Sequence, residues 1–318
     1  MLILWLLIAA AGVGAIVWGA EAFAEHLAVA SARLGVSTFA LAVLLAGAEP
    51  EELATAVTAS LRHAPAIALG DVIGANVAMC LVALGIGAVL SPLPFDRQAR
   101  RYALWGLPAG ALAAVVAWDG RVTRPEAILL IGTYFAFVAT IWVLERRPPA
   151  MGETAEVGEA AAPPAGGAGA RIGRELGLVV AGVAAMAIGA TALVEGVRRV
   201  SNVESTQTRL GLVVVGFATA FELVVLAWSV SRRGISAAVV AGVVGSFTYN
   251  ATMTLGAGAL AHPLQVVHAG QLHGPWLMML AALAIVVALA WPSQRLRRPA
   301  GVACLALYVI FVAVVALA

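Results

Sequence analysis

The chain contains no lysine and little charge of any kind. Of its 318 residues, 11% are charged and 62% are hydrophobic, whereas a soluble domain usually carries about 25% charged residues. This balance argues against a water-soluble fold. The formal net charge of +2 is small, and the arginines are not interleaved with aromatic residues, so no nucleic-acid partner is expected.

Cysteine is also scarce, and the common catalytic motifs are missing. Cys80 and Cys304 both lie inside apolar runs, which predicts buried thiols rather than a disulfide or a metal pair. The sequence has no phosphate-binding loop, no nucleophile elbow and no zinc-protease helix motif, which argues against an ATP-driven pump and an intramembrane hydrolase. We therefore expect a protein that is not an enzyme and holds no cofactor.

What the sequence does contain is a series of apolar stretches near the length of about 20 residues that crosses a bilayer. The first run has no basic residues before it and no clear cleavage site, so we interpret it as a transmembrane helix of the mature protein. The stretches predict an all-α membrane protein with ten transmembrane helices, at 2–24, 37–61, 65–90, 102–118, 125–144, 174–198, 210–231, 235–260, 274–291 and 299–317.

A segment rich in proline, glycine and alanine separates five predicted spans from the other five. It lies at 145–173 and predicts a flexible linker between a first five-helix repeat at 1–144 and a second at 174–318. Short cytoplasmic loops collect arginine and lysine. With the N-terminus outside, the inner side of a cell membrane would hold 13 of the 19 arginines, which predicts a cytoplasmic linker.

The two halves resemble each other in sequence. Glu52 follows Gly19 by 33 positions, and Glu222 follows Gly189 by the same number. After one inserted residue the match continues, so that the corresponding segments are about 37–90 and 208–260. An odd number of spans in each half makes the repeats inverted, an arrangement typical of secondary transporters. The alternative is chance similarity between helices rich in glycine and alanine.

Both halves place carboxylates in the middle of a predicted span. Glu49, Glu51 and Glu52 lie in the second span, and Glu222 lies at the equivalent depth of the seventh. An ionised side chain at the centre of a spanning helix costs about 2.5–3.5 kcal/mol, so such residues usually face a cavity and serve an ion path. For Glu49 and Glu51 the alternative is helix-start chemistry beside Pro50. No proline or predicted break precedes Glu222, so we interpret Glu52 and Glu222 as functional.

Further polar residues lie in the third and eighth spans. These are Asp71 and Asn76 in the third and Ser246 and Asn250 in the eighth, among small residues that let helices pack closely. We expect their oxygen atoms to line the same cavity as the glutamates. Interhelical hydrogen bonding is the alternative role for Asn76 and Ser246.

These motifs resemble the alpha repeats of the sodium/calcium exchanger group of the calcium/cation antiporter superfamily, in its prokaryotic form. That family has ten spans in two inverted halves, each with Gly-Thr-Ser-x-Pro-Glu followed by Gly-Asn-x-x-Gly-Ser-Asn-x-x-Asn/Asp. The matching stretches here are 46–52 with 70–79, and 216–222 with 245–250. By position, the resemblance implies that the family's calcium-binding glutamates are Glu52 and Glu222, and that Ser246 and Asn250 are further ligands.

The chain departs from the family pattern at several ligand positions. Ala48-Glu49 and Ala218-Thr219 replace the two Thr-Ser pairs, while Ala75 and Met79 replace the first repeat's serine and final Asn/Asp. Hydroxyl and amide donors that the family uses around sodium are therefore missing. Glu49 adds a titratable acid that can carry a proton instead.

We hypothesise a secondary active antiporter that exchanges calcium for sodium or protons. The alternatives are a proton-coupled cation antiporter without sodium coupling, and a degenerate homologue with a structural or regulatory role in the membrane. Calcium takes six to eight oxygen ligands.

The expected partners are inorganic cations and the lipid bilayer, with no obligate protein partner evident. Weaker candidates for a metal site are His262, His268 and His273, in one outer loop. The candidate ion ligands are Glu52, Glu222, Asn250, Ser246, Thr219, Glu49, Asn76 and Asp71.

Overall fold

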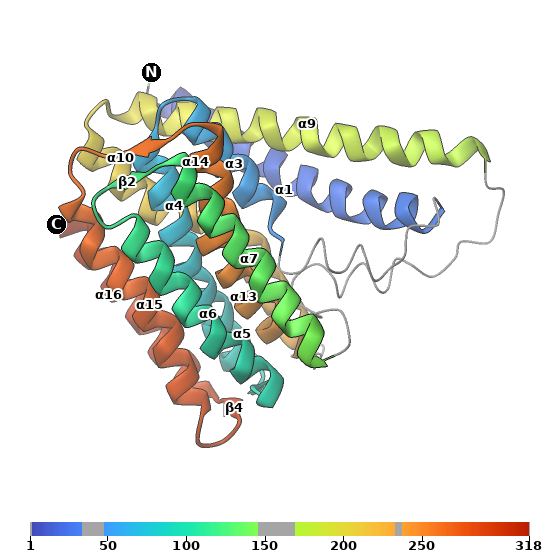
Figure 1. Cartoon of the computed structure of the whole chain (residues 1–318), viewed down its shortest axis with the longest axis vertical. Coiled ribbons are helices and arrows are strands. Elements are labelled where there is room, and N and C mark those ends of the chain that lie inside the picture. The colour runs from blue at the N-terminus through green and yellow to red at the C-terminus, as the bar shows by residue number, and fades with distance from the viewer. Residues whose placement is uncertain (1, 34–47, 146–168, 233–236, 318) are drawn as a thin grey trace.

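The structure, a computed structural model, describes residues 2–33, 48–145, 169–232 and 237–317, and these residues are nearly all helical (Figure 1). The α-helices are α1 (Leu2–Arg33), α3 (Pro50–Leu61), α4 (Pro65–Ala78), α5 (Leu84–Leu90), α6 (Arg97–Val116), α7 (Arg124–Glu145), α9 (Gly169–Val200), α10 (Glu204–Leu210), α11 (Gly216–Thr219), α12 (Phe221–Arg232), α13 (Ala237–Tyr249), α14 (Leu255–Ala261), α15 (Gly270–Ala290) and α16 (Arg298–Leu317). Three π-helical segments join consecutive helices, namely η1 (Met79–Ala83), η2 (Gly211–Val215) and η3 (Asn250–Thr254).

Two short antiparallel ribbons add strand structure that the all-α prediction did not include. β1 (Leu93–Pro94) pairs with β4 (Arg295–Leu296), and β2 (Arg121–Val122) pairs with β3 (Leu264–Gln265). The ribbons lie at opposite ends of the helix bundle (Figure 1). Because each ribbon takes one strand from either side of the predicted linker, the two halves of the chain are joined at both ends of the bundle.

Most of the predicted linker at 145–173 lies outside the described residues, but both of its ends are helical. Helix α7 continues to Glu145, and α9 begins at Gly169, a few residues before the predicted start of the second half at 174. The first part of the predicted span 37–61 and the start of 235–260 also lie outside the described residues.

Long apolar helices make the chain a multi-pass membrane protein. Six described helices are long and apolar enough to cross a bilayer, or seven if a bent pair counts as one span. The prediction was ten. Broken helices and the arginines in the first turn of α6 lower the count among the described residues, since both shorten the apolar stretches.

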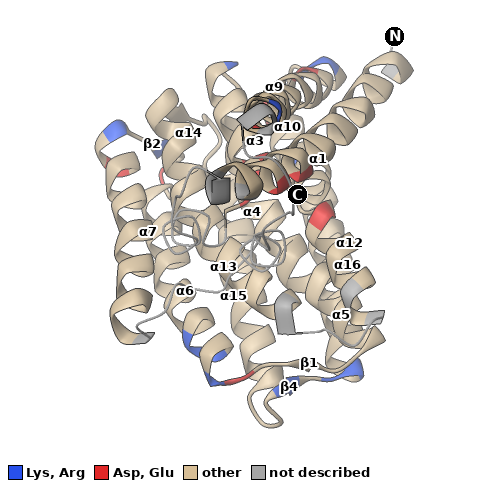
Figure 2. Ribbon diagram, turned by 90° about the vertical axis from the view of Figure 1, so that its right-hand side faces the viewer, with Lys and Arg blue, Asp and Glu red and all other residues tan. Residues whose placement is uncertain are grey.

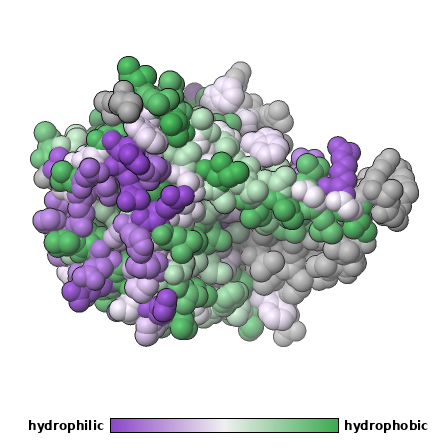
Figure 3. All heavy atoms as spheres, turned by 90° about the horizontal axis from the view of Figure 1, so that it is seen from above, coloured by the Kyte–Doolittle hydropathy of each residue, from purple (hydrophilic) through white to green (hydrophobic). Residues whose placement is uncertain are grey.

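The outer surface is rich in large apolar side chains, as a lipid-facing surface requires. Ile3 on α1 is 74% exposed and Val143 on α7 is 70% exposed. Figure 3 views the end of the bundle that carries β2 and β3. Hydrophilic side chains gather over one part of that end, and hydrophobic side chains surround them.

Helices α1 and α9 form an antiparallel pair that extends from the side of the bundle (Figure 1). The pair packs through facing glycines, because a Cβ on Gly12 would lie 2.6 Å from the carbonyl oxygen of Gly189, and one on Gly19 would lie 2.7 Å from that of Gly182. Small residues allow backbones to approach this closely in a membrane. The spacing of seven residues on each helix therefore aligns two contacts along one face.

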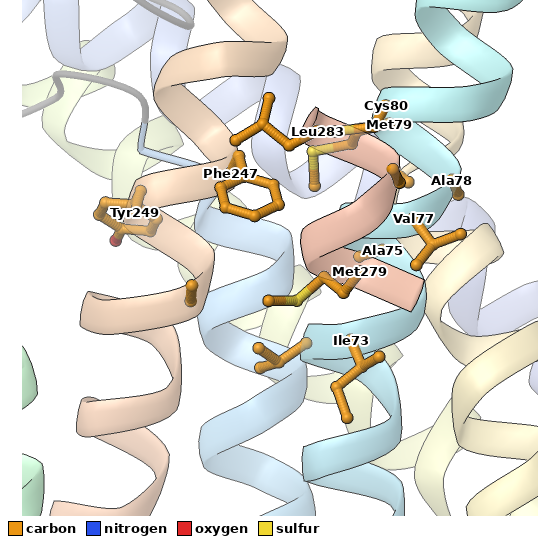
Figure 4. Close-up of a cluster of buried hydrophobic side chains, with 14 of the residues drawn as sticks. Ile73, Ala75, Val77, Ala78, Met79, Cys80, Phe247, Tyr249, Met279 and Leu283 are labelled. Atoms are coloured by element: carbon orange, nitrogen blue, oxygen red, sulfur yellow. The ribbon is translucent and has the colours of Figure 1, made fainter. Parts of the chain in front are cut away.

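Helix α4 lies at the centre of the bundle. Thirteen of its fourteen residues are buried, and it packs against α3, α11 and α15. Around its C-terminal end and η1, apolar side chains from α4, α13 and α15 form a tight cluster that includes Met79, Phe247 and Met279 (Figure 4). Cys80 and Cys304 are both free and buried, as the sequence predicted.

Candidate functional site

Helix α3 begins inside the protein, and three carboxylates lie at its start. Glu49 occupies the N-cap, Pro50 the first helical position, and Glu51 and Glu52 the first turn. The helix-start geometry considered for Glu49 and Glu51 is therefore present. It does not account for their burial, because the three glutamates are only 3%, 1% and 1% exposed and solvent is not available to stabilise them.

Helix α12 begins in a similar way, which corrects the expectation that no break precedes Glu222. The axes of 204–219 and 221–229 differ by 41°, and Glu222 lies in the first turn of α12. The break has a local cause. The π-helical segment η2 ends a few residues before it, and π-helical insertions are a common cause of sharp helix kinks.

The register of these two helices pairs Glu51 with Glu222. Both α3 and α12 have 12 residues, and Glu51 and Glu222 are each the second residue of their helix. Spacing from Gly19 and Gly189 had instead aligned Glu52 with Glu222. An equal number of residues from each glycine does not show that Glu52 and Glu222 are equivalent, because the connection before one helix can be one residue longer than the connection before the other.

Five carboxyl groups lie around these helix starts, each within electrostatic range of at least one other. For Glu51 the strongest charged neighbours are Glu222 and then Glu49. For Glu52 they are Glu51, Asp71 and then Glu222. Within the described part of the chain, neither carboxylate oxygen of Glu52 has a hydrogen-bond partner, and one oxygen each of Glu51 and Asp71 also has none. Buried carboxyls in this state require cations or protons.

Two hydrogen bonds join carboxyls of the first half to hydroxyls of the second. The Ser246 hydroxyl on α13 donates to Glu49, and the Thr219 hydroxyl on α11 donates to Asp71 on α4 at 2.9 Å. Close packing makes the second contact possible, since a Cβ on Gly216 would lie 2.5 Å from the backbone nitrogen of Ala75. The predicted residues Glu49, Ser246, Thr219 and Asp71 are thus brought together in two pairs.

The two candidate asparagines differ in their environment. Asn76 donates to the carbonyl oxygen of Phe247 at 3.4 Å and to the Met279 sulfur at 3.5 Å, which fits the interhelical hydrogen bonding considered as its alternative role. Asn250 is fully buried, and neither of its polar atoms has a partner among the described residues. It begins η3, as Met79 begins η1 in the first half. Insertions of π-helix are frequent at functional sites.

Sequence reasoning missed other polar residues near the carboxyls. Tyr249 lies within electrostatic range of Glu49, Glu51 and Glu52, and Thr254 is buried with a hydroxyl that has no partner among the residues described. A signal for Thr254 was available, because Ser246, Asn250 and Thr254 follow one another at intervals of four and therefore recur along one helix face. Nothing in the sequence pattern indicated Tyr249.

The arrangement suits an ion that takes ligands of mixed type. In the described ranges, no three Asp, Glu, His or Cys side chains are placed to hold one metal ion. A divalent ion here would take two carboxylates and complete its shell with hydroxyl, amide or carbonyl oxygens. Calcium accepts six to eight such oxygens in irregular geometry. The residues therefore fit calcium better than a transition metal, which prefers imidazole or thiolate ligands.

The three histidines considered for a metal site do not form a cluster. His262 lies edge-on to His63, with ring centroids 4.5 Å apart, and His268 contacts Glu204 at 3.2 Å. His273 stacks on Trp118 with centroids 4.0 Å apart. Each ring has a separate partner, so the weaker metal hypothesis gains no support from their positions.

Comparison with known proteins identifies relatives of this arrangement. A family model described as sodium/calcium exchanger protein matches residues 2–143 and 175–317. An uncharacterized membrane protein of Methanocaldococcus jannaschii is 23% identical over 298 residues, which are 93% of this chain and 91% of that protein. The sodium/calcium exchanger MaX1 of Methanosarcina acetivorans is 34% identical over 80 residues, 24% of this chain and 23% of that protein. The putative antiporter CaxA of Alkalimonas amylolytica is 23% identical over 85% of this chain and 83% of its own length.

Solved structures of the sodium-calcium exchanger NCX_Mj share the fold. One of them, soaked with 2.5 mM Na⁺ and 10 mM Sr²⁺, matches with a TM-score of 0.60 and 20% sequence identity, covering 98% of this chain and 99% of that chain. The backbone arrangement is therefore common to both proteins over nearly their whole lengths.

Proposed function

This chain belongs to the sodium/calcium exchanger protein family, and we propose that, within this family of cation antiporters, it exchanges calcium for sodium or protons. The observation that carries the proposal is the meeting of Glu51, Glu52 and Glu222 at two helix starts inside the protein. Two carboxylates neutralise one divalent ion. The N-terminal turns of discontinuous helices at a repeat interface are where such transporters bind their substrates.

Glu51 and Glu222 are the pair that bridges the transported ion in this proposal. Their matching positions in α3 and α12 and their electrostatic proximity support the pairing. Glu52, which the sequence spacing aligned with Glu222, is a third carboxylate beside this pair. Ser246, Asn250 and Thr219 would contribute neutral oxygen ligands, while Asp71, Asn76 and Glu49 would line the path through the same region.

The proposed architecture is ten transmembrane helices in two inverted five-helix repeats. Its support is the recurrence of elements in the same order: α1 and α9 each have 32 residues, α3 and α12 each have 12, and η1 and η3 each have five. The two ribbons fit the same two-fold relation, because each of them, β1·β4 and β2·β3, pairs one strand from the first half with one strand from the second.

The proposed topology has the N-terminus outside and the central linker in the cytoplasm, from the distribution of arginines. A single cysteine at Ala160 should then react with an impermeant thiol reagent only after cells are permeabilised. Reaction in intact cells would reverse the orientation.

The counter-ion is the second part of the proposal. Ala48, Ala75, Ala218 and Met79 stand where the resembling family has donors around sodium. We therefore expect transport to depend less on sodium than is usual in that family, and calcium flux to persist under a pH gradient alone.

The deciding experiment is uptake of radiolabelled calcium into proteoliposomes with sodium and pH gradients imposed separately. Flux under a pH gradient without sodium supports proton coupling, whereas flux that needs sodium and ignores pH shows that the missing donors are not essential. Protein-free liposomes provide the background. Absence of flux under both gradients, with the protein folded, would overturn the antiport proposal and favour a structural or regulatory role.

A further inference from the structure

A cleft lined by arginine and tryptophan lies between α6 and the C-terminal end of α15, on elements separate from the carboxyl site. Its volume is about 330 Å³, and it is open to the surface. Asp96, the N-cap of α6, is next to Arg97 in the sequence, and its carboxylate accepts a hydrogen bond from the backbone N–H of Ala99 at 2.8 Å. The lining residues are Arg97, Arg100, Arg101, Leu104, Trp105 and Trp291.

Two of the arginines that line the cleft lie over aromatic rings. The Arg100 guanidinium carbon is 5.2 Å from the centre of the Trp291 ring, and that of Arg101 is 5.7 Å from the Trp105 ring. No ion pair joins Arg97 or Arg100 to a carboxylate in the described residues. The Arg100 Nε donates to the backbone oxygen of Asp96 at 3.4 Å. The terminal N–H groups of a stacked guanidinium remain available, and they match phosphate oxygens in a bidentate geometry.

The position of the cleft is that of a membrane interface. Trp291 is 53% exposed, and Leu104, which also lines the cleft, is 43% exposed. Tryptophan is enriched where the hydrocarbon core meets the headgroups. A charged headgroup in the cleft would therefore continue into an apolar surface able to contact acyl chains.

The end of the bundle around the cleft is strongly basic. The segments 91–105 and 291–305, joined by the β1·β4 ribbon, carry six arginines and one carboxylate, Asp96. Figure 2 shows these basic residues at the end of the bundle that bears β1 and β4. Positive charge marks the cytoplasmic side of membrane proteins, and the lipids of that leaflet are the anionic ones.

We propose that this cleft is a binding site for the headgroup of an anionic phospholipid. The phosphodiester accepts hydrogen bonds from Arg97 and Arg100, and the acyl chains lie against Leu104 and the edge of Trp291. The proposal does not depend on which ions the protein transports.

Native mass spectrometry of the full-length protein in detergent, titrated with phosphatidylglycerol or phosphatidylcholine, tests this site. Phosphatidylglycerol should bind at least about tenfold more tightly than phosphatidylcholine. The Arg97→Gln/Arg100→Gln variant should lose about a hundredfold or more in affinity for phosphatidylglycerol, the factor expected for two charge-assisted hydrogen bonds. The matched control Arg295→Gln/Arg297→Gln removes the same charge from the same end, and should stay within about twofold of wild type because neither side chain lines the cleft.

Three results would overturn the proposal. Equal binding of phosphatidylcholine would remove the charge selectivity, and equal loss in the control variant would indicate a diffuse field instead of a site. Competition by inorganic phosphate or glycerol phosphate at millimolar concentration would identify a soluble phosphate as the ligand. If the double variant does not fold, Trp291→Leu, which removes the ring beneath Arg100, should reduce phosphatidylglycerol affinity about threefold, and an unchanged affinity would contradict the site.

Discussion

The two halves of the chain have closely matched helices but different polar side chains. The first half contributes four of the five carboxyls around the site, Glu49, Glu51, Glu52 and Asp71. The second half contributes Glu222 and the buried neutral side chains of Thr219, Ser246 and Asn250. The two halves thus have helices of equal length at these places but carry different polar side chains.

The difference shows which features the fold requires and which the ion site determines. Both halves begin a 12-residue helix one residue before a glutamate, with Pro50 as the first residue of α3 and Phe221 as the first residue of α12. The helix start is therefore the shared feature, since it places a carboxylate at a helix N-terminus. The surrounding donors are free to differ, and they do.

The largest expected effect on calcium uptake comes from Glu51 and Glu222, the carboxylates at equivalent positions of α3 and α12. Glu51→Gln and Glu222→Gln should each abolish saturable calcium uptake in proteoliposomes, because removing one partner of a buried ion pair costs about 3–5 kcal/mol, more than a hundredfold in affinity. The double variant should resemble either single variant, since one bridged ion makes the two contributions interdependent.

Matched variants distinguish this pairing from the one that sequence spacing predicts. Glu52→Gln should weaken calcium uptake less than Glu51→Gln does. Glu25→Gln, which removes an exposed acid on α1, should leave uptake unchanged. Loss of uptake in Glu52→Gln with near-native uptake in Glu51→Gln would restore the pairing of Glu52 with Glu222, and native affinity in the Glu222 variant would exclude a shared site.

A second test compares the first residues of the two π-helical segments. Asn250→Leu removes a buried amide that has no partner among the described side chains, and it should lower calcium affinity about tenfold or more, as loss of a hydrogen-bonding ligand of 1–3 kcal/mol implies. Met79→Leu at the corresponding position changes shape but not volume, and should alter stability by less than about 1.5 kcal/mol with unchanged uptake. Equal effects of the two changes would show that the halves do not differ in ligand chemistry.

Much of this fold could be predicted, because a bilayer restricts a chain to apolar helices of defined length. The breaks were harder. Pro50 indicates the start of α3 directly, whereas the break before Glu222 follows the π-helical segment η2, and a π-helical insertion has no pattern in the sequence. The ribbons, each two residues long, are too short for any periodicity to appear.

The eight candidate residues of the sequence analysis lie around the starts of α3 and α12 and on α4, α13 and η3. For Glu51 the sequence left a helix-start role open because Pro50 precedes it, and the sequence cannot show that such a start is buried. The contacts of Glu49 with Ser246 and of Asp71 with Thr219 join residues nearly 200 and 150 positions apart, so only the folded chain reveals them.

A third, smaller effect concerns the hydrogen bond between the halves at Asp71. Thr219→Val keeps the side-chain shape but leaves Asp71 without its hydroxyl donor, which should reduce stability by about 1–3 kcal/mol. Thr140→Val on α7 is the control, because that exposed hydroxyl bonds only to the Ala136 carbonyl of its own helix and should change stability by no more than about 0.5 kcal/mol. Thermal unfolding in detergent measures both, and equal shifts would remove any special role for the Asp71 contact.

The smallest expected effect comes from an ion pair that breaks the symmetry of α1 and α9. His26 and Glu175 lie 2.7 Å apart at one end of the helix pair, whereas at the other end Gly196 packs against Trp5. A double-mutant cycle with His26→Gln and Glu175→Gln should give a coupling of about 0.2–1 kcal/mol, as for other partly exposed pairs. Calcium uptake should not change, because the symmetric glycine contacts hold the helices together without the ion pair. A coupling above about 2 kcal/mol, or altered uptake in either single variant, would mean that this end of the pair differs functionally from the other.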